Sequence, residues 1–395
     1  MDIRITPNKL QGCMEIPPSK SYSHRALIAA ALGSGEAVGV GDSADIEATR
    51  ACLCAIKEKK PLFANESGST LRFMIPLALV INGFVEISGA KRLMERPLDD
   101  YFKIFDEKKI EYSFENNTLY AKGKLTGGDY YIRGDVSSQF ITGLLFALPL
   151  AEGDSRIIVT TKLESKAYVD MTIDVQRKFG IEIEEADNTY IVKGNQKYKN
   201  ERYTVEGDFS QAAFFLAMGD VTLTGLNSES IQGDKEIVEV YRAMGMDIIK
   251  TDEGYISKGN AKKNIVVDVS QIPDCVPVLA CVMALCRGEG KIVNAARLRI
   301  KESDRLAAIC QELKNLGADI TEGDDYLVIR GKSVLDGGVC SAHNDHRIAM
   351  AIATISPHCR GEVVIKGAEC VAKSMPDFWE RFNRLGGITD EFYMG

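Results

Sequence analysis

Hydrophobic and polar residues alternate along the chain in short paired segments that flank an acidic or amide-rich turn. Ile181 and Ile183 alternate with polar residues, and Tyr190 and Val192 do the same after the turn at 186–188. A period of two on either side of such a turn predicts a β-hairpin. The pattern recurs at 244–259 and 316–331, each time after a glycine that ends a helical stretch, and at 109–123 without that glycine. We therefore expect four hairpins.

A second series of glycines marks the points where a hydrophobic helical stretch gives way to a strand. Its members are Gly35, Gly83, Gly153, Gly219, Gly290 and Gly361, and subtraction gives intervals of 48, 70, 66, 71 and 71 residues. A repeat of nearly constant length indicates copies of one structural unit. The chain is thus predicted to contain six units, the first of them shorter than the others.

A third series consists of polar loops that precede apolar helical stretches. The loops are Ser19-Lys20-Ser21, Ser67-Gly68-Ser69, Ser137-Ser138-Gln139, Asp208-Phe209-Ser210, Pro273-Asp274-Cys275 and Asn344-Asp345-His346. Serine, aspartate and asparagine favour the N-cap position, where free N–H groups and the positive end of the helix dipole lie. These helix starts are candidate anion-binding positions.

Six units of mixed strands and helices are too many for one core at this length, so the sequence predicts an α/β (α+β) protein of two similar lobes. The expected division lies near Gly207, with 19–207 as the N-terminal lobe and 1–18 plus 208–395 as the C-terminal lobe. Each lobe then holds three units, and the strand Ile3–Thr6 returns to the second one. A ligand is expected in the cleft between the lobes.

Composition excludes several classes of protein. The 395 residues are 45% hydrophobic and 26% charged, which is typical of a globular chain. With 48 basic and 56 acidic residues the net charge is −8, which disfavours a nucleic-acid partner. No apolar run reaches about 18 residues and no signal peptide opens the chain, so we expect a cytoplasmic protein without a membrane partner. The scattered cysteines and four histidines suggest neither a disulfide framework nor a metal site.

Basic residues recur where the repeat places helix starts and strand ends. They are Lys20, Arg25, Arg72, Arg92, Arg96, Lys301, Arg305, Arg347 and Lys373. Arginine and lysine in such a cluster suit phosphate and carboxylate groups, so the pattern predicts an anionic ligand. The plainer interpretation of the segment 301–305 is a solvated helix start with an i,i+4 charge pair.

These motifs together resemble one family, the 5-enolpyruvylshikimate-3-phosphate synthases. The resemblance rests on Pro18-Ser19-Lys20-Ser21, Ser67-Gly68-Ser69-Thr70-Leu71-Arg72, Glu95-Arg96-Pro97, Val136-Ser137-Ser138-Gln139-Phe140, Arg299-Ile300-Lys301-Glu302-Ser303-Asp304-Arg305, Asn344-Asp345-His346-Arg347 and Ala372-Lys373-Ser374. It implies lobes of three βαβαββ units with helices packed inside mixed sheets (an inside-out α/β barrel). It also implies transfer of the enolpyruvyl group of phosphoenolpyruvate to the 5-hydroxyl of shikimate 3-phosphate by a monomer, on the shikimate route to chorismate, with no metal or cofactor.

The resemblance assigns roles to individual residues. Asp274 would take the proton from the 5-hydroxyl, Glu302 would protonate the methylene carbon, and Lys20 would join them as a catalytic residue. Shikimate 3-phosphate would be bound by Lys20, Ser21, Arg25, Ser137, Ser138, Gln139, Ser165, Tyr168, Asp274, Arg297 and Lys301. Phosphoenolpyruvate would be bound by Lys20, Gly68, Arg92, Gln139, Arg305, His346, Arg347 and Lys373. Glu66, Phe73 and Arg297 depart from the common family pattern.

Several alternatives stay open from the sequence. The same fold serves UDP-N-acetylglucosamine enolpyruvyl transferases, which usually carry a loop cysteine before an Arg-Pro, whereas 90–97 has none. A non-catalytic anion-binding protein on this fold would not need Asp274 and Glu302 beside the cations, because acids weaken anion binding. Asp274 could also be only a helix N-cap, and His346 only a structural histidine.

Overall fold

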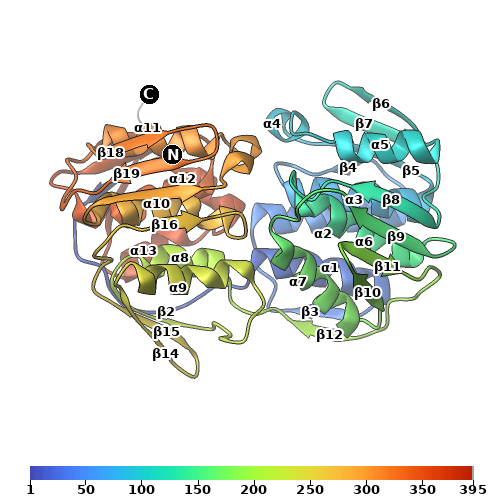
Figure 1. The fold of residues 1–395 in the computed structure, drawn as a ribbon, viewed down its shortest axis with the longest axis horizontal. Coiled ribbons are helices and arrows are strands. Elements are labelled where there is room, and N and C mark those ends of the chain that lie inside the picture. Colours follow the sequence, from blue (N-terminus) through green and yellow to red (C-terminus); the bar gives the residue numbers. More distant parts are fainter. Residues whose placement is uncertain (394–395) are drawn as a thin grey trace. The chain divides into compact units, whose positions relative to one another are not determined.

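The computed structural model describes residues 1–393, which divide into two compact units. One, called here the first unit, is Lys20–Val205. The other, the second unit, combines Met1–Ser19 with the chain from Glu206 onward. Figure 1 shows that each unit is built of helices and small sheets.

The first unit contains strands, α-helices and one short 3-10 helix, η1. In chain order they are α1 (Lys20–Gly33), β3 (Glu36–Val38), α2 (Ala44–Glu58), β4 (Leu62–Phe63), α3 (Gly68–Asn82), β5 (Phe84–Ser88), α4 (Lys91–Met94), α5 (Asp99–Lys108), β6 (Glu111–Glu115), β7 (Thr118–Lys122), β8 (Gly128–Ile132), α6 (Ser138–Ala147), η1 (Leu148–Leu150), β9 (Ser155–Val159), α7 (Lys166–Lys178), β10 (Ile183–Ala186), β11 (Thr189–Val192) and β12 (Arg202–Thr204).

The second unit opens with two strands from the amino terminus and continues after Val205. Its elements are β1 (Asp2–Thr6), β2 (Gln11–Glu15), α8 (Phe209–Leu216), β13 (Asp220–Thr224), η2 (Gly233–Glu236), α9 (Ile237–Ala243), β14 (Asp247–Lys250), β15 (Gly254–Lys258), β16 (Val266–Asp268), η3 (Pro273–Cys275), α10 (Val276–Leu285), β17 (Glu289–Val293), η4 (Ala296–Ile300), α11 (Arg305–Asn315), β18 (Asp319–Glu322), β19 (Leu327–Arg330), β20 (Gly338–Ser341), α12 (His346–Ile355), η5 (Ser356–His358), β21 (Val363–Lys366), η6 (Ala368–Lys373), α13 (Phe378–Arg384) and β22 (Ile388–Phe392).

Each unit carries three sheets, all of them mixed except the parallel pair β12-β3. Those of the second unit have the strand orders β14-β15-β13-β2, β16-β17-β19-β18 and β20-β21-β1-β22. Those of the first unit are β4-β5-β7-β6, β10-β11-β9-β8 and the two-stranded β12-β3. Among the described residues the β12-β3 sheet is the only one with two strands, because no hairpin lies between β3 and α2 to extend it. This agrees with the shorter first interval in the sequence.

The four predicted hairpins are confirmed. β6 pairs with β7, β10 with β11, β14 with β15 and β18 with β19, each time antiparallel. The tight turns need left-handed backbone, and asparagine and aspartate supply it at Asn116 and Asn117 (φ 51° and 59°) and at Asp187 and Asn188 (φ 41° and 55°). Local turn chemistry and alternation therefore fix these elements.

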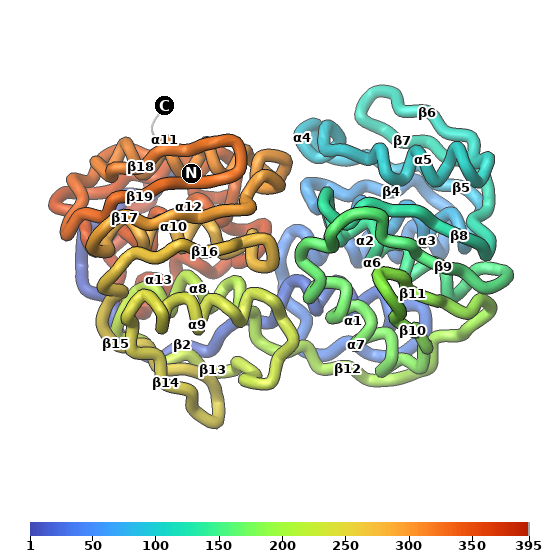
Figure 2. Tube along the Cα trace, in the orientation of Figure 1, coloured from blue at the N-terminus to red at the C-terminus, as the bar shows by residue number. Residues whose placement is uncertain are grey.

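The core of each unit is made by helices that are apolar on nearly every side. All ten residues of α12 are buried, and it packs on α10, whose residues Val276–Ala284 are also buried. In the first unit α3 packs on α6 in the same way. A helix hydrophobic all round belongs inside a core, and the sheets flank these helices, as the tube in Figure 2 lets the reader follow. The starts of the buried helices therefore bring polar loops to defined positions.

Most of those loops cap their helices as expected. Ser67, Ser137, Asp208 and Asp345 each accept a hydrogen bond from a backbone N–H in the first turn of α3, α6, α8 and α12. The loop at 273–275 differs, because η3 precedes α10 and no side chain caps that helix. The carboxylate of Asp274 is therefore available for other contacts.

Candidate functional site

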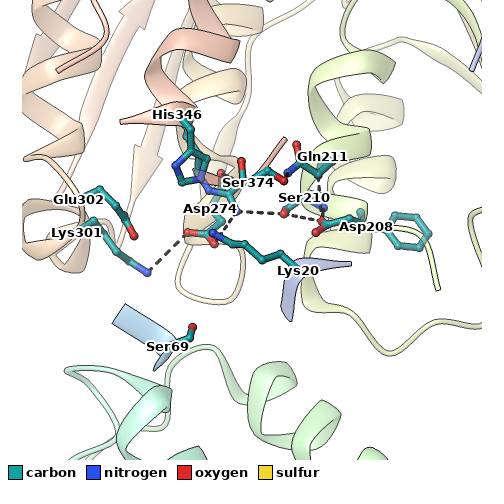
Figure 3. Close-up of polar contacts among 12 residues, drawn as sticks. Lys20, Ser69, Asp208, Ser210, Gln211, Asp274, Lys301, Glu302, His346 and Ser374 are labelled. Carbon is teal, nitrogen blue, oxygen red and sulfur yellow. Dashed lines mark hydrogen bonds and ion pairs between the residues drawn. The ribbon is translucent and has the colours of Figure 1, made fainter. Parts of the chain in front are cut away.

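Three basic side chains of the second unit surround the carboxylate of Asp274. Arg305 Nη1 donates to Asp274 Oδ1 at 2.9 Å, and Arg347 Nη2 donates to Asp274 Oδ2, also at 2.9 Å. Lys301 Nζ lies 3.7 Å from Oδ1, reaching it from the segment before α11 (Figure 3). Asp274 is therefore not a helix N-cap, and the alternative that made it one is wrong.

Arg305 is buried among three carboxylates. Its side chain is 1% exposed, and Nη2 donates to Glu302 Oε2 at 2.7 Å while Nε donates to Asp345 Oδ2 at 2.8 Å. Since α11 begins only at Arg305, the segment 301–305 is not a solvated helix start with an i,i+4 charge pair. That plainer interpretation is wrong. One guanidinium instead joins Asp274 and Glu302, the two predicted catalytic acids.

The electrostatics of this cluster follow from burial and charge. Burial by itself would raise the pKa of Asp274, but Arg347, Lys301 and Arg305 together hold it well below its usual range. Burial lowers the pKa of Lys301 to about 8, against the opposing effect of Asp274. At neutral pH Asp274 is thus ionised, and Lys301 loses its charge only in mildly alkaline solution.

The loop before α12 supports the remaining predicted cations of this unit. Asp345 accepts from the backbone N–H of Arg347 at 3.0 Å and caps α12. His346 is the first residue of α12 and is buried. Lys373 Nζ donates to the carbonyl of Asn344 at 2.5 Å. Arg347, His346 and Lys373, all predicted ligands of one substrate, therefore depend on the same few residues of backbone.

In the first unit, Lys20 begins α1 and pairs with a carboxylate at the start of α2. Its Nζ donates to Asp45 Oδ2 at 2.8 Å, and both side chains are largely buried, with 17% and 12% exposed. An acid in the first turn of a helix is stabilised by the helix dipole. Asp45 thus holds the Lys20 ammonium in a fixed place.

Arg25 is held from several sides within the same unit. Its Nε donates to Thr172 Oγ1 at 2.9 Å, and its two Nη atoms donate to the carbonyls of Ser21 and Tyr168 at 2.7 Å. The guanidinium also lies over the Tyr168 ring, 5.9 Å from its centroid. Burial lowers the pKa of Arg25 to about 10, so it stays charged at neutral pH. Ser165, three residues before Tyr168, is buried at the N-cap of α7.

The starts of α3 and α6 form a second polar group in the first unit. Gln139 Nε2 donates to Ser69 Oγ at 3.0 Å, and Gln139 Oε1 accepts from Arg72 Nη1 at 2.8 Å. The guanidinium of Arg96 covers Gly68 so closely that a Cβ there would lie 2.7 Å from Nη1. Glycine is therefore required at position 68 if Arg96 is to keep its place.

The remaining predicted residues lie in less telling positions. Ser137 caps α6, and Ser138 follows it. Arg92 is exposed on the short helix α4. Arg297 is buried in η4 and donates to the carbonyl of Ser270 at 2.7 Å. The structure thus groups the predicted residues by unit: Lys20, Ser21, Arg25, Gly68, Arg92, Ser137, Ser138, Gln139, Ser165 and Tyr168 in the first, and Asp274, Arg297, Lys301, Glu302, Arg305, His346, Arg347 and Lys373 in the second.

Comparison with known proteins decides the family. The sequence profile of EPSP synthase (3-phosphoshikimate 1-carboxyvinyltransferase) matches residues 5–60 and 50–382. The chain belongs to the EPSP synthase family. It is 47% identical over 422 residues to the 3-phosphoshikimate 1-carboxyvinyltransferase of Clostridium kluyveri, covering 100% of this chain and 99% of that one. The corresponding protein of Clostridium perfringens strain 13 is 46% identical, covering 98% and 99%.

A solved EPSP synthase has the same fold as this chain. The structure from Acinetobacter baumannii superposes with a TM-score of 0.79 at 24% identity, covering 99% of this chain and 100% of that one. At that identity the likeness establishes the fold of this EPSP synthase family member, and the predicted two-lobed α/β class is confirmed. Within residues 1–393 every helix is too short or too polar to span a bilayer, and no group of acidic, histidine or cysteine side chains there suits a metal ion.

Sequence reasoning missed several residues that hold the candidate site together. Asp45 orients Lys20, and Asp345, which accepts from Ser303 Oγ, orients Arg305. Ser210 Oγ accepts from Arg347 Nη2 at 3.1 Å. Figure 3 shows Ser210 beside Asp208, whose carboxylate accepts from its hydroxyl. Asp345 and Ser303 lie inside the motifs 344–347 and 299–305, so their sequence position could have indicated a role in the site. Asp45 lies in no motif, and no sequence signal indicated its role.

Proposed function

We propose that this chain transfers the 1-carboxyvinyl group of phosphoenolpyruvate to the 5-hydroxyl of shikimate 3-phosphate and releases phosphate. The observation that carries the proposal is the cluster in which Asp274 and Glu302 share Arg305 with Lys301 and Arg347 nearby. It supplies two acids for proton transfer and cations for the phosphate and carboxylate groups. Full-length membership of the EPSP synthase family supports the choice of substrates.

The proposed chemistry divides the protons between the two acids. Asp274 takes the proton of the 5-hydroxyl as its oxygen attacks C2 of phosphoenolpyruvate, and Glu302 gives a proton to C3. The C2–O bond to phosphate then breaks, and C3 returns its proton to Glu302. Arg347, Arg305 and Lys20 offset the charge of the departing phosphate. Asp274 passes the proton of the 5-hydroxyl to the departing phosphate, which leaves as hydrogen phosphate, so protons and charge balance without any cofactor.

The two units contribute different ligands in this proposal. For shikimate 3-phosphate the first unit supplies Lys20, Ser21, Arg25, Ser137, Ser138, Gln139, Ser165 and Tyr168, and the second supplies Asp274, Arg297 and Lys301. For phosphoenolpyruvate the first unit supplies Lys20, Gly68, Arg92 and Gln139, and the second supplies Arg305, His346, Arg347 and Lys373. The buried positions of Arg25, Arg305 and Arg347 support these roles, because a buried guanidinium with fixed partners is preorganised for anions.

A turnover assay tests the function directly. Phosphate release should require both shikimate 3-phosphate and phosphoenolpyruvate, and mass spectrometry should find the enolpyruvyl ether at the 5-oxygen. Release with UDP-N-acetylglucosamine in place of shikimate 3-phosphate would favour the related amino-sugar enzyme. Binding of both substrates without phosphate release would favour the anion-binding protein.

We further propose action in the cytoplasm as a monomer; the ten cysteines are all free thiols, as a reducing compartment requires.

Lys301 makes the binding of shikimate 3-phosphate pH-dependent. Its pKa of about 8 means that it is charged below that pH and neutral above it, beside Asp274, Arg305, Glu302 and Arg297. The KM for shikimate 3-phosphate should therefore rise above pH 8, by up to about one log unit per pH unit for a single proton. Steady-state kinetics between pH 6.5 and 9.5 measure it. Lys301→Arg stays protonated and should remove this inflection; its survival in that variant would assign it to another group.

Asp45→Asn should weaken catalysis through Lys20. Without the carboxylate at 2.8 Å the ammonium loses its charged partner, and a charge-assisted hydrogen bond corresponds to about a tenfold or greater effect on kcat/KM. The neighbouring exposed Asp42 offers a control, since Asp42→Asn changes the same charge. Equal kinetics for the two variants would mean that Asp45 does not position Lys20.

A further inference from the structure

The carboxylate of Glu312 lies two helical turns beyond Arg305 on α11 and belongs to no assigned site. It is 1% exposed, and it accepts three hydrogen bonds. Asn315 Nδ2 donates to Oε2 at 2.9 Å, the backbone N–H of Ser341 donates to Oε2 at 3.0 Å, and His343 Nε2 lies 2.6 Å from Oε1. A buried carboxylate is costly unless donors surround it, so this group specifies its neighbours closely.

Two of those neighbours, Ser341 at the end of β20 and His343 after it, lie in the stretch that leads into α12. His343 and Asn344 both have left-handed backbone, with φ of 50° and 52°. Two successive non-glycine residues in this region store strain, which persists only where the surroundings hold it. His343 N also donates to Ser341 Oγ at 3.1 Å. The Glu312 contacts therefore hold a loop whose backbone would otherwise relax.

Two side chains on one face of α11 form hydrogen bonds with this loop. Arg305 and Glu312 are seven residues apart, close to two full turns, so both side chains leave the same side of the helix. Arg305 bonds to Asp345, and Glu312 bonds to His343 two residues earlier. The carbonyl of Asn344, which lies between them in sequence, accepts a hydrogen bond from Lys373 Nζ. The positions of Arg305, Arg347 and Lys373 therefore all depend on the backbone of residues 343–347.

We propose that Glu312 and His343 are positioning residues for the phosphoenolpyruvate half of the site. The pair touches no reacting atom; it fixes the backbone that orients Arg305, Arg347 and Lys373. The assignment of those three cations to phosphoenolpyruvate rests on the proposed function, whereas the mechanical role of the pair does not. Loss of the pair should therefore affect one substrate more than the other.

Three substitutions of His343 separate the contact from the backbone strain. His343→Ala removes the donor and keeps the strain, and His343→Gly removes both because glycine adopts positive φ freely. His343→Gln keeps an N–H donor of similar reach. We expect the alanine and glycine variants to raise the KM for phosphoenolpyruvate about tenfold, the effect of one hydrogen bond to a charged group, with the KM for shikimate 3-phosphate within about twofold of wild type. The glutamine variant should resemble wild type.

Hydrogen exchange of the full-length protein reads the loop without turnover. Peptides covering 341–347 should exchange about tenfold faster in the alanine and glycine variants and at the wild-type rate in the glutamine variant. Asn188→Ala is the matched control, since it alters another left-handed residue (φ 55°) in a hairpin of the first unit. It should leave both readouts unchanged.

The outcomes separate the two proposals. Wild-type exchange and wild-type KM in His343→Ala and His343→Gly would overturn the positioning role. An equal rise in both KM values would also overturn it, because that pattern means general damage. If the wild-type protein fails to turn over the two substrates, the proposed function fails, while faster exchange in 341–347 still supports the mechanical role of Glu312 and His343.

Discussion

Asp274→Asn should lower kcat about 10²- to 10⁴-fold, the usual contribution of a positioned proton-transfer group. The amide cannot accept the proton of the 5-hydroxyl. It also withdraws a negative charge from Arg305 and Arg347, each 2.9 Å from an Asp274 oxygen. These guanidiniums then bind an external anion without an internal competitor, so phosphoenolpyruvate should bind as tightly as in wild type or more tightly. Steady-state kinetics and calorimetry measure the two effects.

The exposed Asp336 is a matched control for this experiment. It pairs with Arg360 in the same unit, and Asp336→Asn should leave kcat and anion binding unchanged. If Asp274→Asn weakens phosphoenolpyruvate binding and spares kcat, Asp274 is a binding residue and not the base. A retained circular dichroism spectrum and melting temperature are needed before either result is interpreted.

Arg347→Ala should reduce kcat/KM about 10²- to 10³-fold, the loss expected for one donor that stabilises developing charge. The side chain is 5% exposed and binds Asp274 and Ser210, so the change removes a preorganised cation rather than a mobile surface charge. The KM for phosphoenolpyruvate should carry part of the loss. Arg347→Lys should recover only part of it, because an ammonium cannot reproduce two parallel N–H donors.

The control for the arginine is Arg360→Ala. Arg360 is 69% exposed, and its ion pair with Asp336 is of the kind that contributes little to stability. Kinetics of Arg360→Ala should match wild type. Turnover of Arg347→Ala close to that of Arg360→Ala would remove Arg347 from the proposed site. Lys20→Ala, measured in the same series, is expected to behave like Arg347→Ala.

The elements of the fold were predictable from sequence because the signals are local. Glycines at positive φ, such as Gly180, Gly245 and Gly317, end helical stretches, and strict alternation follows each of them. The smaller size of the first repeat was visible as a short interval. Most local signals do not say which helices lie at the centre of a unit. The segments 346–355 and 276–285 do, because a helix that is apolar on all sides is expected to be buried in the core.

The candidate site was predictable in its membership and not in its contacts. Asp274 and Arg347 are 73 residues apart in sequence, and their bond exists only after the second unit has folded. From the sequence, a helix cap and an ion-pair partner are equally good uses of an aspartate before an apolar helix. The difference comes from η3, which inserts a 3-10 turn and leaves the carboxylate to the arginines. Asp45 and Glu312 lie outside every sequence motif, and their contacts likewise form only once the chain has folded.

The sheet β20-β21-β1-β22 pairs β1 with two strands from distant parts of the sequence, with Asp2 opposite Phe392 on one side and Lys366 on the other. During synthesis the first strand emerges from the ribosome long before its neighbours exist. It stays without its hydrogen-bonding strands until β21 and β22 have been translated, while the intervening first unit can already fold. A premature stop before β21 therefore leaves β1 without either neighbouring strand, exposed to aggregation and to proteases.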